Sequence, residues 1–168
     1  DKNAASWFAP AGIERGNVWS VEEVMGRSAR LGHTVILLDE TSNWKGGGAA
    51  LLLAEAGHAV TIVTSAAMVM SEMARTNADV TLRARLRQLG VRMMTEAVML
   101  EWHGDGATVQ ASGGKSETLA ADSLVTAATN ISEHALADEL GAPAIGDAIA
   151  ARNAAMAIYE GRKLAMHL

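Results

Sequence analysis

One short apolar segment is followed by a polar turn, three glycines and a run of small residues, a pattern typical of phosphate binding. The apolar run Thr34 to Leu38 ends at Asp39, and Gly46 to Gly48 lead into Ala49 to Glu55. A strand, a glycine-containing turn and a helix N-terminus form an anion site, because unpaired backbone N–H groups and the helix dipole face the ligand. The segment from residue 39 to residue 48 is therefore the first candidate site.

This candidate turn departs from the usual dinucleotide fingerprint. The fingerprint has glycines at its first, third and sixth positions, for a tight turn, for close approach of the pyrophosphate and for helix packing. These positions fall on Thr41, Asn43 and Gly46, so only the packing glycine is present. Thr64 stands where an acidic residue would hold the adenosine ribose, and no arginine for a 2′-phosphate precedes Arg75. Both signals for a nicotinamide cofactor are missing.

Two interpretations of the turn stay open. One is a Rossmann-type scaffold whose nucleotide site has been lost or altered, with Trp44 and Lys45 filling the mouth of the turn. The other is a turn that still contacts a cofactor, in which Trp44 stacks on an adenine. The second interpretation assigns cofactor contacts to five residues of the turn: Thr41, Asn43, Trp44, Gly46 and Gly47.

The pair Gly146-Asp147 is a second candidate site, because it precedes the segment Ala148 to Leu168, which is predicted to be mostly helix. An aspartate at such a junction commonly caps the helix and complements its dipole. The functional alternative is a carboxylate that binds hydroxyls of a ribityl or ribose chain, while the helix N-terminus faces a pyrophosphate. The residues alone leave both roles open.

Other kinds of active site have little support. The chain has no cysteine, which excludes disulfides, thiolate metal sites, iron–sulfur ligation and cysteine nucleophiles on these residues. The five histidines show no ligand spacing and no serine stands in a G-x-S-x-G turn, so we predict no metal site and no catalytic residue here. Arg83, Arg85 and Arg87 are predicted to form the solvated face of a helix, with an acidic partner surface as the alternative.

Composition narrows the class of protein. The chain has 168 residues, of which 49% are hydrophobic and 20% charged, which is sufficient for a compact core. A formal net charge of −5 gives no general attraction to nucleic acid or to an anionic membrane, and no apolar run approaches the length of a membrane span. We therefore expect a cytoplasmic protein without nucleic-acid or membrane partners. A chain that begins at Asp1 is compatible with a piece of a longer protein.

The elements that must position these residues alternate between strand and helix. Asp1 to Asn17 is predicted to be irregular, and Ser20 begins a capping box whose apolar stripe extends to Leu31. The run Ala59 to Thr64 is a second buried strand, which completes a right-handed βαβ unit closed by Gly57 at the helix end.

The rest of the chain predicts a helix, a three-stranded meander and a return to the sheet. The fold class is α/β: a Rossmann-like three-layer nucleotide-binding domain with an antiparallel β-meander. The expected elements are a helix at residues 80–89, strands at 91–95, 97–102, 107–111, 117–119 and 123–128, a helix at 133–140, a very short strand at 144–145 and a helix at 148–168.

In their order along the chain, four segments resemble the C-terminal region of the trimethylamine dehydrogenase and 2,4-dienoyl-CoA reductase family of flavin oxidoreductases. They are VWSVEEVM at residues 18–25, the βαβ run at 35–64, DSLVTAATN at 122–130 and AIGDAIAARNAAMAIYEGRKLA at 144–165. In that family an N-terminal TIM barrel holds FMN and a four-iron cluster. Two domains similar to the FAD and NAD(P) domains of glutathione reductase follow the barrel.

The resemblance implies a division of this chain. Residues 33–121 correspond to the NAD(P)-like Rossmann domain with its meander. Residues 1–32, with a connecting helix, and residues 122–168 correspond to parts of the FAD- or ADP-like domain. It also implies that Gly146 and Asp147 lie against FAD or ADP, whereas FMN and the 4Fe-4S cluster belong to a part of the polypeptide outside these residues.

The departures at Thr41, Asn43 and Thr64 place the sequence nearer to the amine dehydrogenases than to the reductases that bind NADPH. By resemblance, such a chain holds an adenine nucleotide or shapes an electron-transfer surface, and the catalytic centre lies elsewhere. Its expected partners are the TIM-barrel portion of the same polypeptide, an electron-transfer flavoprotein and a second copy in a homodimer. The alternative function is a non-catalytic Rossmann-like module for nucleotide sensing or protein interaction.

Overall fold

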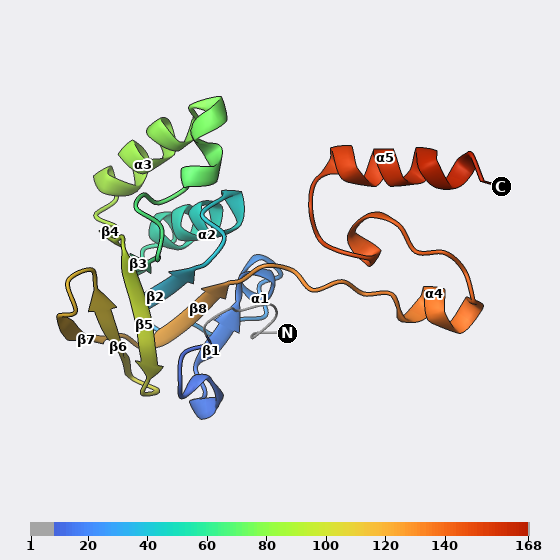
Figure 1. Cartoon of the computed structure of the whole chain (residues 1–168). Coiled ribbons are helices and arrows are strands. Elements are labelled where there is room, and N and C mark those ends of the chain that lie inside the picture. Colours follow the sequence, from blue (N-terminus) through green and yellow to red (C-terminus); the bar gives the residue numbers. More distant parts are fainter. Residues whose placement is uncertain (1–8, 168) are drawn as a thin grey trace. The chain divides into compact units, whose positions relative to one another are not determined.

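A parallel sheet between a layer of helices and a small antiparallel sheet dominates the structure (Figure 1). This computed structural model describes residues 9–167. The parallel sheet has the order β1-β8-β2-β3-β4, and the antiparallel sheet has the order β5-β6-β7. The expected three-layer α/β class with its meander is confirmed.

The elements have the following bounds. The strands are β1 (Val18–Ser20), β2 (Thr34–Asp39), β3 (Ala59–Val63), β4 (Arg92–Met94), β5 (Ala97–Trp102), β6 (Gly106–Ala111), β7 (Ser116–Ala120) and β8 (Ser123–Ala127). The helices are α1 (Val21–Met25), α2 (Trp44–Glu55), α3 (Ala78–Gln88), α4 (Ala135–Leu140) and α5 (Ala154–Ala165), with 3₁₀ helices η1 (Ile13–Arg15), η2 (Ser71–Thr76) and η3 (Gly146–Ala148).

Strand β2 explains why the domain has three layers. Its side chains alternate between the two faces of the sheet, as in any strand, and both faces are covered. Val35 and Leu37 join the apolar cluster formed with α1, α2 and α3, whereas Ile36 and Leu38 join the cluster formed with the meander. An apolar residue at every position from 35 to 38 is therefore required.

The N-terminal helix begins as expected but is shorter. The Ser20 hydroxyl accepts a hydrogen bond from the Glu23 backbone N–H at 3.2 Å, and the Ser20 N–H donates to the Glu23 carboxylate at 2.8 Å. This is the predicted capping box. Helix α1 ends at Met25, and the preceding residues 18–20 form β1, which sequence reasoning missed because three residues are too few to show a strand pattern.

Helix α2 begins earlier than predicted. The prediction placed Trp44 and Lys45 in the turn and the glycines before the helix, but all of them lie in its first turns. The physical reason is Asn43, whose side-chain oxygen accepts the Lys45 backbone N–H at 2.8 Å and so caps the helix start. The prediction for the helix end is confirmed, since Gly57 follows α2 with a φ of +93°.

The C-terminal segment differs more from the prediction. Residues 144–145 form no strand, and the expected helix from residue 148 begins at Ala154 instead. Asn153 caps α5 by accepting the Met156 backbone N–H at 3.0 Å, because asparagine is a strong N-cap residue. Gly146 and Asp147 therefore start the separate 3₁₀ turn η3 and do not precede the long helix directly.

Contacts within the chain divide it after Ala128 into two units. Both apolar clusters consist of residues from the first unit. The division into residues 1–32, 33–121 and 122–168 rests on the resemblance and stays a prediction, although β8 pairs directly with β2 in one sheet. The stretch predicted to be irregular includes residues 1–8, which lie outside the described residues. None of the described helices has the length and apolar content that a bilayer span requires.

Candidate functional site

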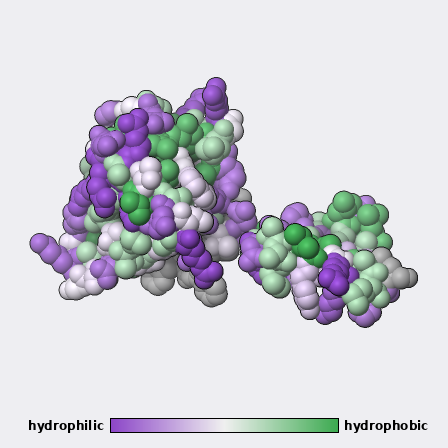
Figure 2. Space-filling view, turned by 90° about the horizontal axis from the view of Figure 1, so that it is seen from above, coloured by the Kyte–Doolittle hydropathy of each residue, from purple (hydrophilic) through white to green (hydrophobic). Residues whose placement is uncertain are grey.

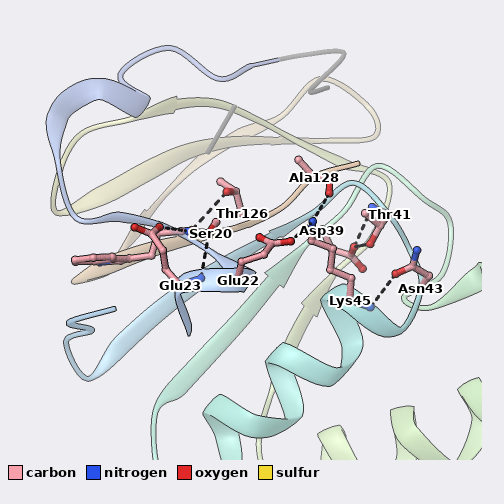
Figure 3. A network of polar contacts seen from close by, with 10 residues as sticks. Ser20, Glu22, Glu23, Asp39, Thr41, Asn43, Lys45, Thr126 and Ala128 are labelled. Atoms are coloured by element: carbon pink, nitrogen blue, oxygen red, sulfur yellow. Dashed lines mark hydrogen bonds and ion pairs between the residues drawn. The ribbon is translucent and has the colours of Figure 1, made fainter. Parts of the chain in front are cut away.

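The turn between β2 and α2 is organised around the carboxylate of Asp39 (Figure 3). One oxygen, Oδ1, accepts hydrogen bonds from the backbone N–H groups of Thr41 and Ser42, both at 3.0 Å, and from the Thr41 hydroxyl at 2.9 Å. Backbone N–H groups at this kind of turn are the donors that a nucleotide phosphate would use. In this chain the N–H groups of Thr41 and Ser42 donate to the Asp39 carboxyl group instead.

Asp39 is buried with only 1% of its surface exposed. Its second oxygen, Oδ2, is also buried and has no hydrogen-bond partner among the described residues. Burial raises the pKa of Asp39, against the hydrogen bonds from Thr41 and Ser42, which act to lower it. The carboxyl group therefore holds its proton to a higher pH than an exposed aspartate does.

Two of the predicted cofactor residues, Gly46 and Gly47, have packing roles. A Cβ on Gly46 would lie 2.3 Å from the Asp39 carboxyl carbon, and a Cβ on Gly47 would lie 2.2 Å from the sulfur of Met70. At these distances the Asp39 or the Met70 side chain would have to move to admit any larger residue. The predicted packing role of Gly46 is confirmed, but its close neighbour is the carboxylate at the end of β2.

Lys45 links three elements at the carboxyl edge of the sheet. Its Nζ donates to the Ala128 carbonyl oxygen at 2.8 Å and lies 2.7 Å from the Glu22 carboxylate (Figure 3). Burial acts to raise the pKa of Glu22, but its hydrogen bonds, first of all the one from Lys45, and the charge of Lys45 together lower the pKa.

The position of these contacts matters because β2 and β8 flank the point where the strand order reverses. In open α/β sheets, ligands bind in the crevice outside the carboxyl ends of the strands at this point. Here the Glu40 N–H donates to the Ala127 carbonyl at 3.1 Å, and Lys45 holds the next carbonyl. Hydrogen bonds of Glu40 and Lys45 to these two carbonyl groups therefore lie where a nucleotide would be expected to bind.

Trp44 and Thr64 complete the turn. Trp44 is 58% exposed, so it does not fill the mouth of the turn as one interpretation expected. Thr64 is buried at 1% exposure, and its hydroxyl lies 3.4 Å from that of Ser42 and 3.3 Å from the Ala66 N–H. At the end of β3, where a dinucleotide-binding domain has an acidic residue for the ribose, this chain therefore has a buried threonine whose hydroxyl contacts the neighbouring turns.

The second candidate site lies in the C-terminal unit. The Gly146 N–H donates to Glu160 Oε2 at 2.7 Å, and Arg152 forms an ion pair with Glu160 Oε1. The Gly146 N–H and then Arg152 lower the pKa of Glu160. Asp147 Oδ1 accepts the Arg152 backbone N–H at 3.3 Å, so this aspartate caps a turn rather than the helix α5.

The structure thus brings Thr41, Gly46 and Asn43 together with Asp39 in one turn, and brings Gly146 together with Asp147 in another. Sequence reasoning missed Asp39 and Glu160 as the acceptors of these N–H groups. An aspartate two residues before a polar turn residue is the signal of an Asx-type turn and could have identified Asp39. No local signal identifies Glu160, because it lies 14 residues from Gly146.

Comparison with known proteins defines the class. The profile of the pyridine nucleotide-disulphide oxidoreductase family matches residues 45–157, so the chain belongs to this family. It is a nucleotide-binding region of the flavin-oxidoreductase type. A search of curated proteins gives no match.

Solved structures show the same fold. Histamine dehydrogenase from Rhizobium sp. 4-9 matches with a TM-score of 0.88 and 24% identity, over 100% of this chain and 29% of that one. 6-Hydroxypseudooxynicotine amine oxidase from Pseudomonas geniculata N1 matches with a TM-score of 0.87 and 24% identity, over 96% of this chain and 26% of that one. 2-Naphthoyl-CoA reductase matches with a TM-score of 0.80 and 27% identity, over 95% of this chain and 24% of that one. The chain therefore spans between 24% and 29% of these relatives.

Proposed function

We propose that this chain is the C-terminal nucleotide-binding region of a flavin- and iron–sulfur-dependent oxidoreductase of the amine dehydrogenase type. Its role is to hold an adenine nucleotide, ADP or FAD, at Gly146 and Asp147, or to shape the surface that passes electrons on. Family membership and the likeness to an amine dehydrogenase and an amine oxidase support this role. They do not favour the alternative of a non-catalytic sensing or interaction module.

The observation that carries the proposal is the occupied β2–α2 turn. Asp39 accepts the N–H groups of Thr41 and Ser42. A bound pyrophosphate would have to displace this carboxyl group. By resemblance, the members of the family with an altered turn at this place are the amine dehydrogenases, which pass their electrons to a flavoprotein. This supports the amine dehydrogenase type over the NADPH-dependent reductases.

The proposal assigns the remaining parts to the polypeptide outside this chain. FMN and the 4Fe-4S cluster would lie on an N-terminal TIM barrel, and the absence of cysteine excludes thiolate ligation of a cluster by these residues. FMN supplies the two-electron oxidation of substrate when bound there. This chain's residues hold the adenine nucleotide and contact the barrel, an electron-transfer flavoprotein and a second copy in the homodimer.

Calorimetric titration of the chain with ADP, FAD, NADH and NADPH tests the proposal. We expect ADP or FAD to bind, and binding to weaken in Asp147→Ala because the carboxylate that contacts ribose or ribityl hydroxyls is removed. Asp138→Ala is the matched control, since Asp138 lies in the same unit, is exposed and pairs with His134 on the solvent-exposed surface. Tight NADPH binding would contradict the argument from Asp39. Absence of binding by all four nucleotides would contradict the nucleotide-holding role.

A further inference from the structure

A cleft of about 520 Å³ lies between helix α3, strand β4 and the segment that follows β3. Strand β4 is an edge strand of the parallel sheet, so the cleft lies at one end of the strand order. Met68, Val80 and Met93 form part of its apolar wall, and Arg83, Arg87 and Thr95 supply its polar groups. This site is separate from the β2–α2 turn and plays no part in the proposed function.

Arg83 is a fixed part of the cleft. Its side chain is 13% exposed, and its Nη1 contacts the Asp79 carboxylate at 2.7 Å and the Val69 carbonyl oxygen at 3.1 Å. Asp79, at 4% side-chain exposure, balances the charge of Arg83. The other guanidinium nitrogens of Arg83 make no hydrogen bond within residues 9–167, so they remain available as donors.

Arg87 lies one helical turn further along α3 and differs from the neighbouring arginines. Arg85 pairs with Glu55 at 3.1 Å and Arg92 pairs with Glu117 at 2.9 Å. Arg87 has no acidic partner in the part of the chain that the structure describes. The Thr95 hydroxyl has no hydrogen-bond partner among the same residues. The cleft therefore carries one uncompensated positive charge in a chain whose net charge is −5.

We propose that this cleft binds a small organic anion: a phosphate or carboxylate group on an apolar body. The anionic group contacts Arg87, with Arg83 and Thr95 as further donors, and the apolar body packs on Met68 and Met93. Guanidinium groups form charge-assisted hydrogen bonds with both kinds of anion. The volume lies within the range of small-molecule sites, and such sites combine apolar walls with a few placed polar groups. The expectation of one solvated arginine face is thereby corrected, since Arg83 is largely buried.

Calorimetric titration of the full 168-residue chain with phenyl phosphate, phenylacetate and inorganic phosphate tests this site. We expect saturable binding of at least one organic anion, tighter than that of inorganic phosphate because the ring adds apolar contact. The two organic probes distinguish a phosphate from a carboxylate head group. In Arg87→Gln we expect about tenfold weaker binding, from loss of a charge-assisted hydrogen bond.

Arg85→Gln is the matched control, because Arg85 lies on the same helix but does not line the cleft. It should bind like the wild type. If neither organic anion binds, or if Arg85→Gln weakens binding as much as Arg87→Gln, the site does not exist as proposed. Thr95→Val provides an independent variant outside the helix, and unchanged binding in both Thr95→Val and Arg87→Gln would also refute the proposal.

Discussion

Asp39 lies at the end of β2, where its carboxyl group accepts hydrogen bonds from two backbone N–H groups and one hydroxyl of the following turn. It is unusual in that one oxygen is well bonded while the other is buried without a partner among the described residues. A buried polar atom without a partner costs free energy, and protonation reduces that cost. The residue is thus both the organiser of the turn and a source of pH dependence.

Replacement of Asp39 by asparagine should remove one component of the pH dependence of stability. The folded-state pKa is raised, so the folded chain binds more protons than the unfolded chain above the unfolded pKa of about 4. The free energy of unfolding should therefore fall as the pH rises from about 4 through the folded pKa, by at most about 1.4 kcal/mol per pH unit.

Urea unfolding of wild type and Asp39→Asn across this range measures the effect as the difference between the two curves. Asp105→Asn serves as control, because Asp105 is exposed in the turn before β6. A difference curve that is flat for Asp39→Asn would show that the carboxyl group ionises as freely in the folded as in the unfolded chain.

Gly46 and Gly48 should respond oppositely to alanine. In Gly46→Ala the new Cβ would overlap Asp39, and overpacking of this kind costs about 1–3 kcal/mol. In Gly48→Ala the Cβ meets no atom within 4 Å, so the higher helix propensity of alanine should stabilise the chain by about 0.5–1 kcal/mol. Free energies of unfolding measure both, and equal effects of the two substitutions would argue against the close packing of Gly46 on Asp39.

At the scale of elements, Asp122, the residue before β8, forms hydrogen bonds with the first residue of β2. Its Oδ2 accepts the Thr34 N–H at 2.7 Å and the Thr34 hydroxyl at 2.6 Å, and Gly32 packs closely against the same side chain. The Thr34 hydroxyl, followed by the Thr34 N–H, lowers the pKa of Asp122. Thr34 and Asp122 are 88 positions apart in the sequence, so this contact links β2 to a distant part of the chain.

Replacement of Thr34 by valine should reduce this contribution at neutral pH. A lowered folded pKa stabilises the chain above the unfolded pKa of about 4, and the stabilisation is lost as the pH falls through the folded pKa. Wild type and Thr34→Val should therefore differ in stability at pH 7 and converge toward pH 2. Thermal unfolding at the two pH values measures this, and a difference that is the same at both would exclude the carboxylate as its cause.

Sequence patterns predicted the elements that depend on local signals. The buried strands, the Ser20 capping box, the meander turns and the glycine at the end of α2 all leave marks within a few residues. The helices α2 and α5 begin at other residues than predicted, because Asn43 and Asn153 cap them and an apolar pattern does not mark a capping asparagine. The site was only partly predictable, since the contacts of Lys45 with Ala128 and of Gly146 with Glu160 join residues far apart in sequence.

At the scale of the whole chain, apolar burial is unevenly distributed. The buried apolar residues of the described chain end at Ala128, whereas Leu136, Leu140, Ile158 and Met166 in the C-terminal unit are 67–73% exposed. Apolar burial is the main favourable contribution to folding. Among the described residues, the buried apolar core therefore lies in the first unit.

A chain that ends at Ala128 should keep the cooperative unfolding transition of the 168-residue chain, with a midpoint that shifts by only a few degrees. A peptide of residues 129–168 should show no cooperative transition, since it lacks a buried core. Circular dichroism during heating measures both. Loss of the transition in the shortened chain would show that the first unit depends on the second for its stability.

The close contact between Gly46 and Asp39 also limits the order in which these positions can change. A larger residue at position 46 would force the Asp39 side chain to move, and removal of Asp39 alone leaves the N–H groups of Thr41 and Ser42 without this acceptor. In a chain without Asp39, a bound anion would be a new acceptor for these N–H groups. Substitutions at the two positions should therefore be strongly epistatic, and the sign of the interaction should depend on the ligand present.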